Sequence, residues 1–200
     1  MISIIDYGLG NVKAFSNIYR SLQIEHKITS NIKDLHKSSK IILPGVGSFD
    51  WAMQKLKNSG LKDELDFLVL KKKVPILGIC IGMQLMANES EEGLSRGFGW
   101  IKGKVKKFSS NTKNLILPHM GWNNVELQKN SLIKGILNPS FYFLHSYYFD
   151  PESQDYVLGK TLYEVKFASI INRENIYGIQ FHPEKSHDNG LNILRNFANL

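Results

Sequence analysis

The chain has 200 residues, of which 42% are hydrophobic, a formal net charge of +7 and one cysteine. This length and apolar content suffice for one core without disulfides, so we expect a single domain over residues 1–200. One cysteine excludes the disulfide framework of a small secreted protein, and no apolar run approaches the ~20 residues of a membrane span. The N-terminus has no basic leader, so we expect a cytoplasmic protein with no membrane contact.

The basic charge raises the question of nucleic acid binding. The lysines are spread along the chain, with clusters at 71–73 and 102–107, and no platform of aromatic and arginine residues accompanies them. A solvated, lysine-rich surface is the ordinary interpretation of this pattern, and a basic docking face for an acidic protein is the alternative. We therefore expect no nucleic acid partner.

The first half of the chain alternates between strand and helix patterns. The predicted strands cover residues 2–6, 24–29, 40–45 and 74–79. The predicted helices cover residues 11–22, 49–56, 61–72 and 82–88. Near-continuous apolar strands separated by amphipathic helices predict an α/β fold with a mostly parallel sheet that helices cover on both faces.

The second half has closely spaced strand patterns, which predict antiparallel additions to the sheet. These strands cover residues 100–108, 115–127, 142–149, 156–162, 166–172 and 176–184. A predicted helix over 189–200 closes the chain. Sites in open α/β sheets lie beyond the carboxyl ends of the strands, which is where the glycine-rich segments 44–49 and 78–82 fall.

The segment 78–82, Gly-Ile-Cys-Ile-Gly, fits the thiol form of the nucleophile elbow that joins a strand to a helix. The glycines leave room for a strained turn that lifts the sulfur of Cys80 out of the sheet. The helix that begins near Gly82 directs its positive end at the sulfur and favours the thiolate, the form that attacks. A small buried hydrophobic cysteine is the alternative, but it does not explain the strand, turn and helix around Cys80.

A thiolate needs a proton carrier, and the chain has six histidines. His182 has the best setting, because Pro183 pushes it toward extended geometry and Glu184 then lies on the same side of the chain. Glu184 would fix the tautomer of His182 and support its charged form, as the acid of a triad does. Cys80, His182 and Glu184 are therefore the predicted nucleophile, general base and acid, and orienting group. A surface turn is the alternative for the segment 182–184.

The attacked carbonyl needs donors for its developing negative charge. The amide of Ile81, next to the nucleophile, is one candidate, and the amide of Val46 in the glycine loop 44–47 is the second. A tight turn after a strand is the other interpretation of this loop, and both can hold.

A metal centre is a weaker alternative, since the sequence has neither HExxH nor CxxC spacing. Its candidate ligands are His119, His145, His182 and His187. We expect no metal and no cofactor.

With these residues in place, the sequence resembles class I, triad-type glutamine amidotransferases from end to end. Six motifs narrow the resemblance to the glutaminase subunits of imidazole glycerol phosphate synthases. They are DYGLGN at 6–11, PGVGSF at 44–49, GICIGMQLM at 78–86, PHMGWN at 118–123, FLHSY at 143–147 and GIQFHPEKS at 178–186. The resemblance implies a flavodoxin-like fold and hydrolysis of the side-chain amide of glutamine to glutamate and ammonia.

The resemblance also implies which residues hold the substrate. Gln84, one helical turn beyond Cys80, would meet the amino-acid end of glutamine, and Glu92 would bind its ammonium group. Ser146 and Tyr147 would offer backbone contacts to its α-carboxylate. Without the family, Gln84 is an ordinary helix-surface glutamine and Glu92 belongs to an acidic solvated loop.

The family further implies a heterodimer with a (β/α)8-barrel cyclase. Ammonia would pass through that barrel to a carboxamide ribonucleotide, giving imidazole glycerol phosphate and aminoimidazole carboxamide ribonucleotide in histidine biosynthesis. Asn11, Trp122 and Lys185 match positions at or near that contact. The alternatives are a helix N-cap, a partly buried aromatic and a surface charge. We expect His119 to be a structural or interface residue rather than a catalytic base.

Two departures from the family pattern leave the acceptor of the ammonia open. Ile81 stands where leucine is common, and Lys102 stands where many members carry proline, although neither side chain touches the chemistry. The closest alternative is a paralogous glutaminase that serves another synthase, such as one that aminates surface-polysaccharide sugars. A stand-alone cysteine hydrolase or isopeptidase is the alternative from another class, and it would need no partner.

Overall fold

The computed structural model describes residues 1–109 and 115–200 and centres on an eight-stranded sheet. Its parallel half consists of β2 (His26–Thr29), β1 (Ile2–Ile5), β3 (Lys40–Leu43), β4 (Ile76–Ile79) and β13 (Ile176–Ile179). Numbered in chain order, these strands run 2-1-3-4-5, the order of flavodoxin-like folds. Every residue of β1 and β4 is buried, because helices cover both faces, and this explains their near-continuous apolar sequence.

Antiparallel strands extend the sheet beyond β13, as the closely spaced patterns predict. They are β12 (Val165–Arg173), β11 (Val157–Tyr163) and β8 (Glu126–Leu127). Two small sheets accompany this half. One contains β10 (Tyr147–Pro151), β6 (Gly103–Lys107) and β5 (Glu89–Ser90), and the other pairs β7 (His119–Asn124) with β9 (Ser140–His145).

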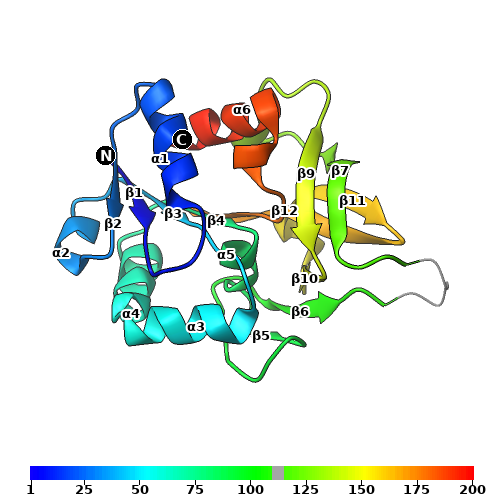
Figure 1. Ribbon diagram of the computed structural model, residues 1–200, viewed down its shortest axis with the longest axis horizontal. Coiled ribbons are helices and arrows are strands. Elements are labelled where there is room, and N and C mark those ends of the chain that lie inside the picture. Colours follow the sequence, from blue (N-terminus) through cyan, green and yellow to red (C-terminus); the bar gives the residue numbers. More distant parts are fainter. Residues whose placement is uncertain (110–114) are drawn as a thin grey trace.

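Helices cover the parallel half from both sides (Figure 1). On one side α1 (Val12–Ser21) lies against α6 (His187–Ala198), and on the other α3 (Phe49–Asn58) lies against α4 (Leu61–Asp66). The shorter helical segments are α2 (Ile32–Leu35), η1 (Phe67–Lys71), α5 (Ile81–Gln84), η2 (Ser131–Ile133), η3 (Gln154–Tyr156) and η4 (Pro183–Lys185). Within the described ranges, no helix is long and apolar enough to cross a membrane.

Several predicted elements differ from the structure. The strand predicted over 115–127 is divided into β7 and β8, which belong to different sheets, and the strand predicted over 176–184 ends at Ile179, before η4. The strand predicted over 142–149 is two strands, because the chain passes at Ser146 from β9 to β10, which belong to different sheets. The helix predicted over 61–72 continues from α4 into the π-helical segment η1. The helix predicted over 82–88 ends at Gln84, because the backbone of Asn88 already bonds to Gly103 as the chain enters β5.

Candidate active site

Cys80 stands at a strained turn between β4 and α5. Its φ of 55° and ψ of −112° are rare for a residue with a side chain, and such strain concentrates at functional sites. The flanking glycines are required by close packing, since a Cβ on Gly82 would collide with the carbonyl oxygen of Leu43 and one on Gly78 with the backbone of Gly82. The predicted elbow is therefore present. The helix after it has only four residues, so its dipole is weaker than the sequence pattern implied.

His182 and Glu184 form a buried pair just beyond β13. Nδ1 of His182 lies 2.9 Å from Oε1 of Glu184, and the two side chains are only 7% and 6% exposed. The pair is the predicted one, but the expected geometry is only partly right. His182 is extended, with φ −98° and ψ 98°, whereas Glu184 reaches it from the 3-10 turn η4. The amide of His182 is anchored on the carbonyl of Tyr142 at 2.8 Å.

The electrostatics of His182 depend on both partners. Burial lowers its pKa, but hydrogen bonds to Cys80 and Glu184, together with their charges, outweigh burial and raise the pKa to about 10. The raised pKa favours the protonated imidazole, with Glu184 on its Nδ1 side. Such a group can give a proton to a leaving nitrogen.

Cys80 and His182 meet at a cavity of about 280 Å³ beyond the carboxyl ends of the parallel strands. Its lining contains residues from segments far apart in sequence: Val46, Gly47, Cys80, Ile81, Gln84, Glu92, Pro118, Leu144, His145, Ser146, Tyr147 and His182. All the residues predicted as nucleophile, base, oxyanion donor or substrate contact line this cavity. Glu184 does not line it, and its carboxylate lies behind His182, bonded to Nδ1, where an orienting residue belongs.

Comparison with known proteins identifies the family. The family model described as "Glutamine amidotransferase class-I" matches residues 3–200. The chain is a class I glutamine amidotransferase. The elbow, the buried histidine–carboxylate pair and the flavodoxin-like strand order therefore occur together in a chain of this family.

The relatives of this glutamine amidotransferase share its whole length. An imidazole glycerol phosphate synthase subunit HisH from Leptospira borgpetersenii is 51% identical over 204 residues, covering 100% of both chains. The HisH of Bdellovibrio bacteriovorus is 46% identical over 204 residues, again covering 100% of both. A protein named HisH 2 from Methanococcus maripaludis is 47% identical over 98% of each chain. A solved glutamine amidotransferase structure, 18% identical, has the same fold, with a TM-score of 0.75 over 100% of this chain and 99% of its own.

Gln84 of this glutamine amidotransferase is buried rather than on a helix surface. Its Nε2 donates to the carbonyl of Tyr147 at 2.9 Å and to Oε1 of Gln180 at 3.0 Å. Its own Oε1 is buried with no hydrogen-bond partner among the described residues. Gln84 therefore holds the main chain at Tyr147 from inside the wall of the cavity.

Glu92 follows β5 and is bonded to the start of α3. Its Oε2 accepts a hydrogen bond from the amide of Phe49 at 2.7 Å. In the other direction, the carboxylate of Asp50 in α3 accepts hydrogen bonds from the amides of Leu94 and Ser95 in the loop, each at 2.9 Å. Burial raises the pKa of Glu92, the Phe49 amide lowers it and the charge of Asp50 raises it further. The net shift is upward. The loop that carries Glu92 and the helix after the glycine loop therefore hold each other.

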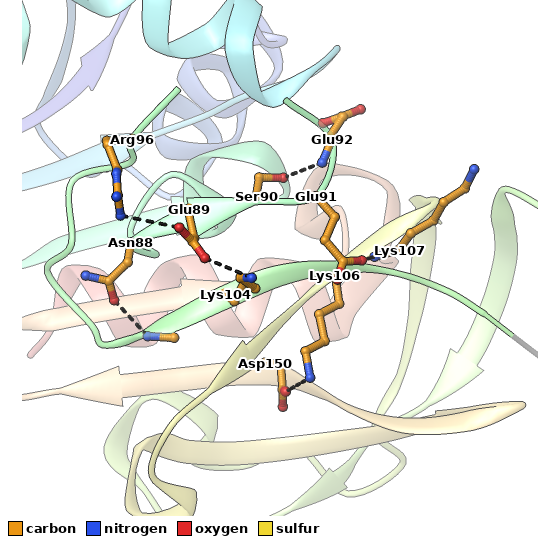
Figure 2. A network of polar contacts seen from close by, with 11 residues as sticks. Asn88, Glu89, Ser90, Glu91, Glu92, Arg96, Lys104, Lys106, Lys107 and Asp150 are labelled. Atoms are coloured by element: carbon orange, nitrogen blue, oxygen red, sulfur yellow. Dashed lines mark hydrogen bonds and ion pairs between the residues drawn. The ribbon is translucent and has the colours of Figure 1, made fainter. Parts of the chain in front are cut away.

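Ion pairs stabilise the small sheet formed by β5, β6 and β10 (Figure 2). They are Glu89 with Arg96 at 3.3 Å, Glu89 with Lys104 at 2.8 Å and Lys106 with Asp150 at 2.7 Å. Each exposed pair contributes little by itself, but the Glu89–Lys104 and Lys106–Asp150 pairs connect the neighbouring strands β5, β6 and β10, and the Arg96 pair ties the loop after β5 to that strand. Glu92 leaves one end of this sheet and Tyr147 begins another strand of it, so the sheet supports both cavity residues.

The glycine loop 44–47 forms another part of the cavity wall, through Val46 and Gly47. The hydroxyl of Tyr7 donates to the carbonyl of Pro44 at 2.8 Å and ties the loop to the end of β1. Gly47 has a φ of +94°, which favours glycine at this turn. The loop 44–47 is thus both a tight turn after β3 and part of the cavity wall.

The three predicted interface residues lie outside the cavity lining. The side chain of Asn11 accepts the amide of Ala14 at 3.2 Å and caps α1, as the alternative interpretation had it. Trp122 stacks on His187 with ring centroids 5.0 Å apart, and Nζ of Lys185 lies 5.2 Å from the ring centre of Tyr142. Tyr142 is directly opposite Trp122 in the β7–β9 pair, so Trp122 and Lys185 share one surface.

Sequence reasoning missed Gln180, whose Nε2 lies 3.8 Å from the sulfur of Cys80. The signal was available, because Gln180 precedes His182 by two residues and a period of two places both on one side of a strand. It also missed Leu144, whose carbonyl is 4.0 Å from the same sulfur, since nothing local marks a main-chain group as part of a site.

Proposed function

We propose that this chain is the glutaminase subunit of an imidazole glycerol phosphate synthase, with residues 1–200 forming one catalytic domain. One observation carries the proposal. The sulfur of Cys80 and the imidazole of His182 line one cavity, and the carboxylate of Glu184 is bonded to that imidazole, in a chain that matches such subunits over its whole length. The biosynthetic role, on soluble metabolites, would be carried out in the cytoplasm.

In the first half of the reaction, Sγ of Cys80 attacks the side-chain amide carbon of glutamine. The amides of Ile81 and Val46 stabilise the oxyanion that forms. His182, whose Nδ1 is engaged by Glu184, presents Nε2 to the reaction and gives its proton to the leaving nitrogen. The carbon–nitrogen bond breaks, ammonia leaves and a glutamyl thioester remains on Cys80.

Water completes the cycle. His182, now neutral, takes a proton from the water molecule while its oxygen attacks the thioester carbon. The carbon–sulfur bond breaks, glutamate leaves, and the thiolate and imidazolium are restored. One glutamine and one water thus give one glutamate and one ammonia.

The amino-acid end of glutamine is assigned to the opposite part of the cavity. Glu92, with Oε2 held by Phe49, binds the ammonium group through its other oxygen. Gln84, which lines the cavity, meets the amino-acid end through its side-chain amide. The backbone of Ser146 and Tyr147 receives the α-carboxylate. The reactive amide then points toward Cys80.

Free ammonia would be protonated in water, so the proposed product route leads directly into a partner, a (β/α)8-barrel cyclase. The surface next to the cavity supports a docking site, because it exposes large apolar side chains. They are Val46, Met120, Trp122 and Leu144. Val46 and Leu144 also line the cavity, so a partner seated on this surface would cover its mouth.

The decisive experiment is co-expression with a candidate cyclase of the histidine pathway, followed by assays with and without the nucleotide substrate. We expect a stable heterodimer that makes imidazole glycerol phosphate from glutamine. One relative is named HisH 2, and this number is a reason to test the partner of this chain directly. If the chain instead binds a sugar-modifying synthetase and ignores the cyclase, the paralogous assignment replaces this one. Peptide turnover without any partner would support a stand-alone hydrolase.

A further inference from the structure

Two buried histidines lie beside the cavity and have no part in the mechanism above. His119 begins β7 and His145 ends β9, and the two are directly opposite each other in the antiparallel pair. Nδ1 of His119 lies 3.0 Å from Nε2 of His145. Both side chains are almost fully buried. A buried polar pair of this kind needs an explanation, because its groups are costly to place in a core.

The hydrogen bonds around the pair determine where each proton lies. Nδ2 of Asn123 donates to the carbonyl of Leu162 at 3.0 Å, and the same NH2 group lies 3.2 Å from Nε2 of His119. Since an NH2 group only donates, Nε2 of His119 accepts and the ring proton of His119 is on Nδ1. That proton is donated to Nε2 of His145, so the proton of His145 is on its Nδ1.

The chain of bonds ends on a residue of the active site. Nδ1 of His145 donates to the carbonyl oxygen of Tyr147 at 2.8 Å. Nε2 of Gln84 donates to the same oxygen at 2.9 Å. Tyr147, Gln84 and His145 all line the cavity. The position of the Tyr147 carbonyl therefore depends on the histidine pair on one side and on Gln84 on the other.

The surroundings keep both rings neutral. His119 is stacked between Phe143 and Tyr163, with ring centroids 4.8 and 3.9 Å away, and His145 packs against Phe167 at 5.2 Å. Burial lowers the pKa of His119 to about 4 and that of His145 to about 3. Protonating either ring would also set two N–H groups against each other in the chain of bonds.

We propose that His119 and His145 are positioning residues that hold Ser146 and Tyr147, and through them Gln84, in the geometry that binds the amino-acid end of the substrate. This inference rests on the proposed glutaminase function. Neither ring carries a proton in the reaction, because all four ring nitrogens are engaged in the chain of bonds from Asn123 to Tyr147.

Two substitutions of His145 distinguish positioning from a purely structural role. His145→Asn can keep a donor near the place of Nδ1, and with it the bond to Tyr147. His145→Gln can keep an acceptor near the place of Nε2, and with it the bond to His119, but it loses the donor to Tyr147. We expect His145→Gln to raise KM for glutamine about tenfold and to change kcat by less than about threefold. His145→Asn should raise KM less. The turnover number changes less than KM because Cys80 is carried by the turn after β4, and the β9 carbonyl that anchors His182, that of Tyr142, lies three residues before His145.

The measurement is glutamine hydrolysis by the reconstituted complex, with thermal unfolding of each variant followed in parallel. His119→Phe keeps the aromatic stack but removes the bond to His145, and it should likewise raise KM more than it lowers kcat. It serves as the test if His145→Gln does not fold. His36→Gln, at the exposed end of α2, is the control and should match the parent protein.

Two outcomes would overturn the inference alone. One is a KM for glutamine that stays at the parent value in His145→Gln and His119→Phe. The other is an equal rise in KM for His145→Asn and His145→Gln. If the parent complex does not hydrolyse glutamine at all, both the inference and the proposed function are overturned.

Discussion

Nδ1 of His182 lies 2.9 Å from Oε1 of Glu184, and the other carboxylate oxygen of Glu184 is buried with no hydrogen-bond partner in the described part of the chain. The carboxylate is therefore directed at the imidazole. Burial lowers the pKa of His182, and the hydrogen bonds and charges of Cys80 and Glu184 reverse that effect. A protonated imidazole next to a sulfur is the state from which amide hydrolysis can begin.

Replacing Glu184 by glutamine keeps a polar group beside His182 but removes the charge. We expect kcat for glutamine to fall by about 10²-fold or more, because His182 loses part of its support as a proton donor. The pKa of His182 should also fall, which an imidazole NMR titration can follow. Glu174→Gln removes an exposed carboxylate paired with Lys73 and is the matched control. A parent-like kcat in Glu184→Gln would refute the orienting role.

Gly82→Ala tests the packing that makes the elbow. The added Cβ would collide with the carbonyl of Leu43, so α5 must move away from β3, and we expect a loss of more than about 2 kcal/mol in the free energy of unfolding. Gly60→Ala is the comparison, since it meets nothing within 4 Å and only strains a left-handed turn with φ +73°, for about 1 kcal/mol. Urea denaturation measures both. An equal or smaller loss for Gly82→Ala would contradict the packing argument.

Two tryptophans offer a matched test of the docking surface. Trp122 is 49% exposed on β7, and Trp51 is 48% exposed on α3. We expect Trp122→Ala to weaken binding to the cyclase at least about tenfold, because aromatic anchors dominate many interfaces. Trp51→Ala should leave the dissociation constant unchanged. Calorimetric titration of the two subunits gives both values, and the reverse order would move the interface away from β7.

Stability should depend on the buried histidines at mildly acidic pH. The pKa of His119, about 4, and that of His145, about 3, lie below the ordinary value of 6.5. The unfolded chain therefore binds more protons than the folded one below pH 6.5, and stability falls as the pH drops from there toward 4. Each ring contributes up to about 1.4 kcal/mol per pH unit. His119→Phe should reduce the slope of unfolding free energy between pH 6 and 4.5, and an unchanged slope would contradict the assignment.

Local patterns were enough to predict the parallel half of the fold and the elbow. The alternation of apolar strands with helices identified β1, β3 and β4, and glycines on both sides of Cys80 marked the turn, because both signals arise within a few residues. The resemblance to the family then located Gln84, Glu92, Ser146 and Tyr147, all of which line the cavity.

Long-range contacts were beyond sequence reasoning. The hydrogen bond from the Phe49 amide to the Glu92 carboxylate joins residues 43 positions apart, and no local pattern signals it. The change of sheet at Ser146 was invisible because alternation continues through it. The pairing of His119 with His145 depends on the register of β7 against β9, which the sequence alone does not determine.

The central claim is that the sulfur of Cys80 performs the attack on glutamine. Cys80→Ala removes that atom from a buried site at little structural cost, so the purified complex should still form. The most direct test of the claim compares two rates of imidazole glycerol phosphate synthesis by this variant, one with glutamine and one with added ammonium salt. We predict that the variant loses the glutamine-dependent rate and keeps the ammonium-dependent one. Glutamine-dependent synthesis at the parent rate would contradict the account.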